Sequence, residues 1–169
     1  FMILWFTGIS GVGKTLIARH TYILLKKKVK NLIHIDGDEF RKLFKNDLGY
    51  SLKDRDKNAE RIINFVIFLN KSGMNVIVSA NLTSQKYRLF CKKKLTKFTE
   101  VNVSSSLNIL KKKDKKNIYK NNDLSKVVGF GIKNIENNTA SYKINNNGSK
   151  KKFLDKGSDI IKKISKNLI

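Results

Sequence analysis

A glycine-rich loop between an apolar strand and a helix constrains this chain more than any other feature. Residues 2–6 are apolar, residues 8–15 match G-x-x-x-x-G-K-[ST], and a helical pattern follows at once. In this context we expect the loop to turn successive backbone N–H groups inward, where they and the positive end of the helix dipole bind phosphate. The residues of this phosphate-binding loop are Gly8, Ile9, Ser10, Gly11, Val12, Gly13, Lys14 and Thr15.

Two residues at the end of the loop have specific roles in this interpretation. Lys14 is expected to reach the β- and γ-phosphates of a nucleotide, and the Thr15 hydroxyl is expected to ligate Mg²⁺. A glycine-rich turn with an incidental lysine is the alternative. The apolar strand before the loop and the helix that begins with Leu16 and Ile17 argue against it.

Strands and helices alternate along the rest of the chain. The predicted strands are 2–7, 32–35, 75–80, 98–103 and 140–144, and the predicted helices are 13–28, 39–45, 54–71, 83–94, a short one from 106, and 153–168. This order is typical of an α/β fold with a doubly wound, mostly parallel five-stranded sheet and helices on both faces. We expect one domain over 1–169, in which the polar, weakly periodic stretch 111–138 is mobile.

Composition excludes some classes of protein. The longest apolar runs are too short to span a bilayer, and the first strand begins at residue 2, so we expect neither a membrane segment nor a signal peptide. Cys91 is the single cysteine, which rules out an intramolecular disulfide and fits a reducing cytoplasm.

The net charge of +23 invites a nucleic-acid interpretation. Nearly all of the cations are lysines, however, and their runs are scattered along the chain. Lys, Asn and Ile have AT-rich codons and Pro, which is absent, has GC-rich ones, so genome bias explains the composition at least as well. We therefore expect no specific nucleic-acid partner, although such a charge would attract anionic nucleotides.

Carboxylates follow the second predicted strand directly, at Asp36 and Asp38. They are expected at the carboxyl edge of the sheet, where α/β folds bind their ligands. The two histidines, His20 and His34, are isolated in the sequence, and packing or surface roles are favoured over catalytic ones.

Three motifs in order resemble the adenylylsulfate (APS) kinase family. The chain reads W-F-T-G-I-S-G at 5–11, D-G-D-x-x-R at 36–41 and L-G-Y-S-x-x-D-R-x-x-N at 48–58. The family carries WFTGLSGxGKS, LDGDxxR and LGFSxxDRxxN at matching intervals. The resemblance is strong to about residue 103. It implies a P-loop kinase that uses ATP and Mg²⁺ to phosphorylate the ribose 3′-hydroxyl of a small-molecule nucleotide, APS, giving PAPS. Homodimers are common in the family.

The resemblance also implies roles for individual residues. Asp38 would hold the acceptor 3′-hydroxyl or a metal-bound water, with Asp36 in support, and a helix N-cap is the alternative role for Asp38. Thr83 aligns with a serine that is a phosphoserine site in some members. With Lys14, these make the candidate catalytic set.

The acceptor site follows from the same motifs. Arg41 and Arg55 match acceptor-binding arginines, Asn58 matches an acceptor-contacting asparagine, and Tyr50 stands where the family has Phe and can stack on a base. Surface ion pairs are the alternative for the arginines, and a half-buried turn aromatic is the alternative for Tyr50.

The chain departs from the family on the acceptor side. The family reads S/T-A-F-I-S-P where this chain has Asn81, Leu82, Thr83 and Ser84, so the acceptor wall loses an aromatic and a proline. In the lid-like segment 111–138, Lys116 matches an acceptor-binding lysine. Gly129 and Phe130 stand in the family's GFTGID, where Phe130 either covers the base or packs in the core.

These departures leave three hypotheses. The first is APS as acceptor. The second is a cytidine diphosphate derivative, as in the cytidine diphosphoramidate kinases of capsule modification. The third, from another class, is a nucleic-acid-binding or regulatory P-loop NTPase.

Overall fold

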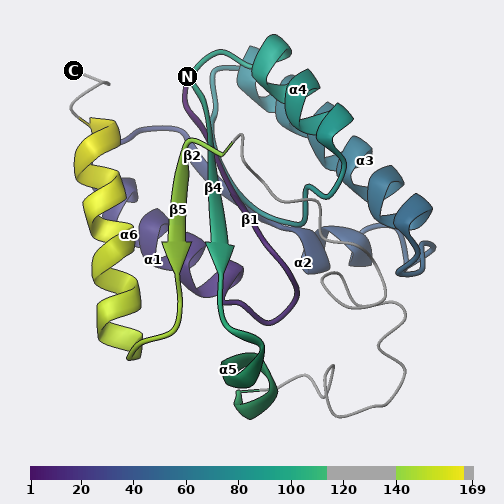
Figure 1. Ribbon diagram of the computed structural model, residues 1–169. Helices are drawn as coiled ribbons and strands as arrows, with labels where there is room; N and C mark the ends of the chain where they lie inside the picture. The colour runs from purple at the N-terminus through teal and green to yellow at the C-terminus, as the bar shows by residue number, and fades with distance from the viewer. Residues whose placement is uncertain (114–139, 166–169) are drawn as a thin grey trace.

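The computed structural model describes residues 1–113 and 140–165 (Figure 1). Its elements alternate along the chain as the sequence predicts. They are β1 (Ile3–Thr7), α1 (Lys14–Lys26), β2 (Leu32–Asp36), α2 (Gly37–Lys42), α3 (Leu52–Lys71), β3 (Asn75–Ser79), α4 (Gln85–Lys94), β4 (Phe98–Ser104), α5 (Leu107–Lys112), β5 (Tyr142–Asn145) and α6 (Lys150–Ser165).

The five strands form one sheet in the order β2-β3-β1-β4-β5, and every neighbouring pair is parallel. The predicted α/β class and five-stranded sheet are therefore confirmed, and the sheet is parallel throughout instead of mostly parallel. β1 lies at its centre, between β3 and β4. The loop that follows β1 consequently lies in the middle of the carboxyl edge, where this kind of sheet binds ligands.

Helices cover both faces of the sheet, and β1 divides the core between them. Met2, Leu4 and Phe6 pack on one face with residues of α1, α5 and α6. Ile3 and Trp5 point the other way and pack with residues of α3 and α4. This alternation is the expected result of a strand buried on both sides.

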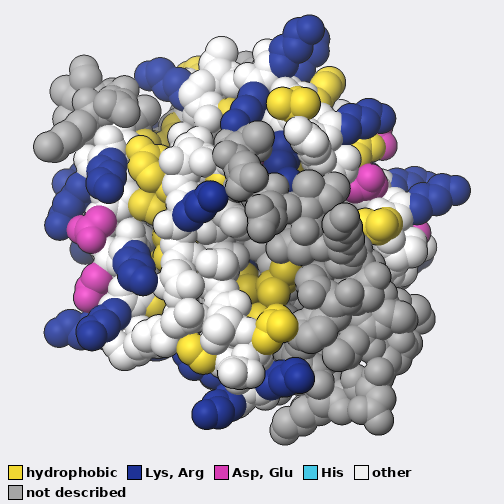
Figure 2. Space-filling model, viewed as in Figure 1, with side chains coloured by type: hydrophobic (Ala, Val, Ile, Leu, Met, Phe, Trp, Pro, Cys, Tyr) yellow, Lys and Arg dark blue, Asp and Glu magenta, His cyan; other side chains and the backbone are white. Residues whose placement is uncertain are grey.

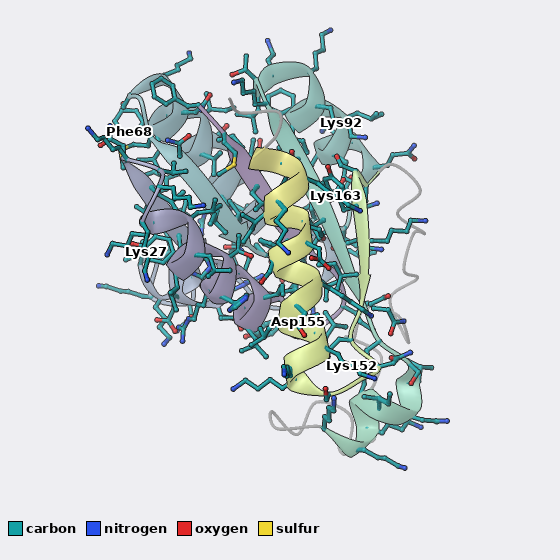
Figure 3. All side chains as sticks on the ribbon, turned by 90° about the vertical axis from the view of Figure 1, so that its left-hand side faces the viewer. Lys27, Phe68, Lys92, Lys152, Asp155 and Lys163 are labelled. Atoms are coloured by element: carbon teal, nitrogen blue, oxygen red, sulfur yellow. The ribbon has the colours of Figure 1, made fainter. Side chains whose placement is uncertain are left out.

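α1 and α6 lie side by side on the first face (Figures 1 and 3). Gly157 lies at this contact, where a Cβ would meet the end of the Ile17 side chain and require it to move. His20 of α1 also lies 3.1 Å from the hydroxyl of Ser158 in α6. The last helix of the chain is thereby fixed to the first one.

Two hydrogen bonds connect the loop between β3 and α4 to β1. The indole N–H of Trp5 donates to the carbonyl of Ala80 over 3.0 Å, and the N–H of Leu82 donates to the Thr7 hydroxyl over 3.0 Å. Trp5 is fully buried in the core. These two bonds hold residues 81–83 at the carboxyl edge.

The described residues on the face drawn in Figure 2 carry basic side chains without a single stripe of charge. Lys and Arg side chains are spread over the face in Figure 2 between white and yellow areas. Within the ranges 1–113 and 140–165, no helix has the length and apolar character needed to cross a membrane.

Candidate nucleotide site

The phosphate-binding loop joins β1 to α1 as its sequence pattern predicts. Gly13 has a left-handed backbone (φ 101°) and directly precedes the first residue of α1. Gly8 also has a positive φ of 145°, and a Cβ there would overlap the main-chain carbonyl of Val103. Only glycine meets both demands, and the loop can then present backbone N–H groups at the N-terminus of α1.

Lys14 folds back over this loop. Its Nζ donates to the carbonyl oxygens of Gly8 and Ile9, both over 2.9 Å. The ammonium group therefore lies above the loop, at the place where the sequence pattern predicts nucleotide phosphates.

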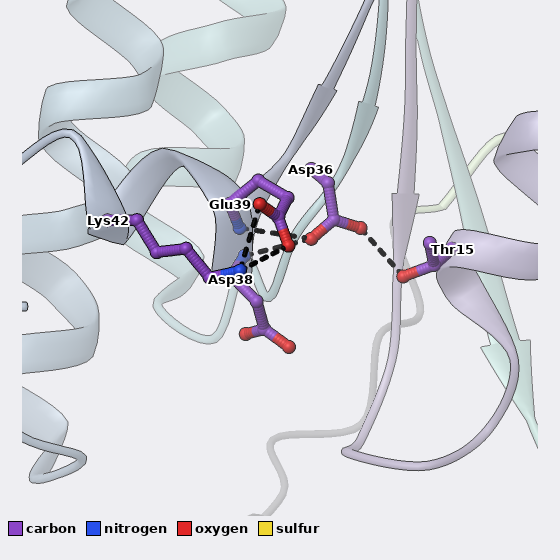
Figure 4. A network of polar contacts seen from close by, with 5 residues as sticks. All are labelled: Thr15, Asp36, Asp38, Glu39 and Lys42. Atoms are coloured by element: carbon purple, nitrogen blue, oxygen red, sulfur yellow. Dashed lines mark hydrogen bonds and ion pairs between the residues drawn. The ribbon is translucent and has the colours of Figure 1, made fainter.

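Thr15 and Asp36 join the loop to the second strand. The Thr15 hydroxyl donates to Asp36 Oδ2 over 2.7 Å (Figure 4). The Ser79 hydroxyl donates to the same oxygen over 2.8 Å. Partial burial by itself would raise the pKa of Asp36, but these bonds and two backbone N–H groups outweigh it and hold that pKa below its usual value. Asp36 is thus a carboxylate at neutral pH.

This geometry suits a magnesium ion held at Thr15. The Thr15 proton is directed to Asp36, so the lone pairs of the hydroxyl oxygen remain for a cation. In the described ranges no group of three or more His, Cys, Asp or Glu side chains could hold a metal ion. Mg²⁺ does not need such a cage, because it is commonly bound by one or two protein oxygens, waters and substrate phosphates.

Asp36, and not Asp38, is the N-cap of α2. Asp36 Oδ1 accepts from the N–H groups of Asp38 and Glu39, over 3.0 and 3.3 Å. The alternative prediction for Asp38 is therefore wrong, because α2 begins two residues earlier than expected. A side chain at Gly37 would lie 2.8 Å from the Cβ of Ala80, so glycine lets the start of α2 pack on the sheet. Figure 4 shows the exposed Asp38 carboxylate pointing away from Asp36.

Arg41 and Tyr50 meet beside α2. Arg41 is only 8% exposed, and its Nη1 donates to the carbonyls of Leu48 and Gly49 over 3.2 and 3.0 Å. The surface ion-pair interpretation is thus wrong for Arg41, which holds the loop before α3. Tyr50 is 56% exposed, so it is not a half-buried turn aromatic.

Arg55 brings a second guanidinium to Tyr50. Ser51 caps α3 by accepting from the N–H of Asp54, and this places Arg55 in the first turn. The guanidinium carbons of Arg41 and Arg55 lie 5.1 and 5.4 Å from the centre of the Tyr50 ring. Burial, and after it the charge of Arg41, lowers the pKa of Arg55. The two cations repel one another, and an anion between them would relieve that repulsion.

Asn58 lies one turn further along α3 and is 6% exposed. Its buried Oδ1 has no hydrogen-bond partner within the described part of the chain. A buried carbonyl oxygen without a donor costs free energy, so this atom is suited to a donor on a bound molecule.

The third group of predicted site residues follows β3. Asn81 is half-buried and Thr83 is 8% exposed at the carboxyl edge of the sheet. Leu82 is fully buried and packs in the core beneath α3 and α4, so its side chain has a packing role here.

Three predicted acceptor residues cannot be placed. The structure does not describe Lys116, Gly129 or Phe130. Of the lid-like segment 111–138 it describes the first three positions. Of those, Lys111 and Lys112 end α5.

Asn146 is a site residue that sequence analysis missed. Its Nδ2 donates to the carbonyl of Val12 over 2.8 Å, and its backbone N–H donates to Ser104. It thereby fixes the middle of the phosphate-binding loop from the far end of the sheet. Its place in an asparagine-rich tract marks only a loop, so no local signal distinguishes it from Asn145 and Asn147.

We expect Asn146→Ala to raise the KM for the phosphate donor about 3- to 10-fold, since one neutral hydrogen bond to the loop is lost. Steady-state kinetics with varied nucleotide measures this. Lys143→Ala, on the exposed side of β5, is the matched control and should be neutral. An unchanged KM in Asn146→Ala would show that the loop keeps its shape without this bond.

Comparison with known proteins agrees with this geometry. A family model described as adenylylsulphate kinase matches residues 1–144. A cytidine diphosphoramidate kinase from Campylobacter jejuni is 33% identical over 166 residues, covering 96% of each chain. An adenylyl-sulfate kinase from Buchnera aphidicola is 33% identical over 171 residues, covering 99% of this chain and 79% of the relative.

The solved structures show the same fold. The APS kinase of Mycobacterium tuberculosis, in complex with AMPPNP and APS, superposes with a TM-score of 0.81 at 24% identity and covers 97% of both chains. The resemblance carried by the three sequence motifs is confirmed by the family model and by the two relatives. The chain is a phosphotransferase and belongs to the adenylylsulphate kinase family.

Proposed function

We propose that this kinase transfers the γ-phosphate of ATP to the ribose 3′-hydroxyl of a nucleotide, with APS as the first candidate acceptor. The observation that carries the proposal is the hydrogen bond between Thr15 and Asp36. It joins the phosphate-binding loop to the N-terminus of α2, the helix that contains Asp38 and Arg41. Donor and acceptor sites then share one carboxyl edge of the sheet. Phosphoryl transfer needs this kind of positioning and charge neutralisation more than covalent help.

Each residue has a stated task in this reaction. The loop N–H groups and Lys14 bind the β- and γ-phosphates, and Thr15 holds Mg²⁺, which supplies charge neutralisation on the transferred phosphate when bound. Asp38 accepts the proton of the 3′-hydroxyl. Its exposed position in the first turn of α2, a helix that it does not cap, supports that task.

The arginines support an anionic acceptor. Arg41 and Arg55 converge on Tyr50, and burial first, then the charge of Arg41, lowers the pKa of Arg55, so keeping the two cations together has a cost. A phosphate or sulfate group between them offsets that cost, while Tyr50 offers a stacking surface. Asn58 supplies an oxygen for a donor, such as the amino group of the acceptor base.

A cytidine diphosphate derivative is the second candidate acceptor. Adenine and cytosine both carry an exocyclic amino group, so Asn58 does not separate them. Asn81 does favour the second candidate, because it replaces an aromatic residue in the wall of the site. The relative from Campylobacter jejuni, named a cytidine diphosphoramidate kinase, also matches nearly the whole of this chain.

The test is ADP release by the purified chain with ATP, Mg²⁺ and each acceptor in turn. We expect turnover with APS and a product phosphorylated at the 3′ position, as shown by phosphorus NMR. Turnover with cytidine diphosphoramidate alone would overturn APS in favour of the second candidate. Turnover with neither, together with nucleic-acid binding that weakens steeply with salt, would favour a P-loop protein of another class.

A pair of variants on α3 sharpens this test. Arg55→Ala is expected to raise the KM of the acceptor about 10- to 100-fold, because a charged hydrogen bond is lost, with little change in the KM of ATP. Arg61→Ala is the control. Arg61 lies on the same helix and forms a partly exposed ion pair with Asp47, so its loss should leave the KM of the acceptor and the KM of ATP nearly unchanged.

A further inference from the structure

The polar contacts of Asp36 extend beyond the site into the sheet. His34 Nε2 lies 3.0 Å from Ser79 Oγ, and Ser79 in turn donates to the same Asp36 oxygen that accepts from Thr15. His34 and Asp36 are two residues apart on β2, so their side chains share a face. Asp36 is paired in register with Ser79 on β3. The parallel pairing of these two strands therefore assembles the group.

The direction of each hydrogen bond follows from the number of protons. Asp36 is ionised and only accepts, so Thr15 and Ser79 must each donate their single hydroxyl proton to it. Ser79 Oγ can then only accept from the ring of His34, which places a proton on Nε2. The charged ring also carries that proton, so the direction is the same in both protonation states.

The surroundings of His34 fix the ring in place. Tyr22 of α1 lies against it, with 6.3 Å between the ring centres. Burial lowers the pKa of His34, the charge of Arg19 lowers it further, and Asp36 acts in the opposite sense. The neutral ring with its proton on Nε2 is accordingly the form present at neutral pH.

We propose that His34 is a positioning residue for the metal-binding end of the phosphate-binding loop. By donating to Ser79, it commits the Ser79 proton to Asp36, and the carboxylate so held directs the Thr15 proton away from the cation. The inference rests on the proposed role of Thr15 as the Mg²⁺ ligand.

Loss of His34 would act through the rotation of one hydroxyl group. Without the His34 N–H that donates to it, the Ser79 hydroxyl can rotate toward other acceptors. Of the two hydroxyl groups that donate to Asp36 Oδ2, Thr15 then remains. The Thr15 hydroxyl is oriented less well, and the effect should appear in the magnesium dependence more than in the folding of the protein.

Two substitutions at position 34 separate positioning from packing. His34→Leu keeps an apolar side chain but removes the donor. His34→Gln keeps an Nε2 donor without a ring. We expect His34→Leu to lower kcat about 3- to 10-fold and to raise the Mg²⁺ concentration for half-maximal activity by a similar factor. His34→Gln should restore both to within about twofold.

Two controls accompany these variants. His20→Leu breaks a similar histidine–serine contact, between α1 and α6, and should change neither constant. Adding His34→Leu to a Ser79→Ala background should have no further effect, because the bond to Asp36 is already missing. Equal impairment in His34→Gln and His34→Leu, additive effects in the double variant, or normal kinetics in His34→Leu would each overturn the inference.

A binding measurement keeps this test separate from the proposed reaction. Titration of a fluorescent ATP analogue at several Mg²⁺ concentrations needs no acceptor, and His34→Leu should again need about 3- to 10-fold more Mg²⁺. If the unaltered protein binds ATP with Mg²⁺ but phosphorylates neither acceptor, the proposed function fails while this comparison still decides the role of His34.

Discussion

Replacing Lys14 with alanine is expected to lower kcat about 100- to 1000-fold, the usual effect of removing one group that stabilises transition-state charge. In the structure the Lys14 ammonium lies above the phosphate-binding loop on the carbonyls of Gly8 and Ile9. It can therefore follow the negative charge that develops as the γ-phosphate leaves. The measurement is ADP release at saturating ATP and acceptor, with circular dichroism to compare the folds.

The variant should remain folded, because the two carbonyls that it exposes lie in a partly open loop that water can reach. Lys27→Ala is the matched control: it removes the same charge from the opposite, exposed end of the first helix, and should leave kcat unchanged. If Lys14→Ala retains most of its turnover, the loop is not the donor site and the proposed reaction fails with it.

Asp38→Asn is expected to lower kcat about 100- to 10,000-fold, the range for loss of a general base. The KM for ATP should change little, since the carboxylate serves the acceptor. The free energy of unfolding should also change little, because Asp36 and not Asp38 caps α2. Single-turnover kinetics and a urea titration of each variant measure the two effects.

Neighbouring carboxylates give the controls for Asp38. Asp36→Ala should lose activity and also about 1 kcal/mol of stability, since it removes the cap. Glu39→Gln removes a carboxylate from the same turn, one that pairs with the exposed Lys42. It should leave kcat and the free energy of unfolding nearly unchanged. A kcat in Asp38→Asn close to that of the unaltered protein would remove Asp38 from the mechanism.

Much of the fold can be predicted from the sequence because the patterns that indicate strands, helices and loops are local. The β-branched residues at 76–78 mark β3, and the loop 8–15 marks the junction of a strand and a helix. Each signal needs only a few neighbouring residues. The parallel direction of the strands then follows from the alternation of strands and helices, whereas their order in the sheet was not predicted.

The cap of α2 was not predicted correctly. With a helix expected from residue 39, Asp38 is the alternative cap, whereas the structure shows Asp36 in that role. A shift of two residues in the start of α2 decides between them, and helix boundaries are the least certain part of a sequence-based prediction. The shift also decides which carboxylate remains for chemistry.

Other contacts could not be predicted from the sequence because their partners are distant. His34 and Ser79 are 45 positions apart, and Asn146 and Val12 are 134 apart. The first pair meets only because β2 and β3 align in one register, and the second only because β5 completes the edge of the sheet. An isolated histidine and an asparagine within a polar tract give no sign of either.

The bond from Asn146 to Val12 has a consequence for synthesis of the protein. The phosphate-binding loop leaves the ribosome well before Asn146 and Phe153, whose side chains pack on it. A nascent chain that ends before these residues has the complete loop sequence without the contacts that fix its shape. We therefore expect firm nucleotide binding only after β5 and α6 have been synthesised and have packed against the loop.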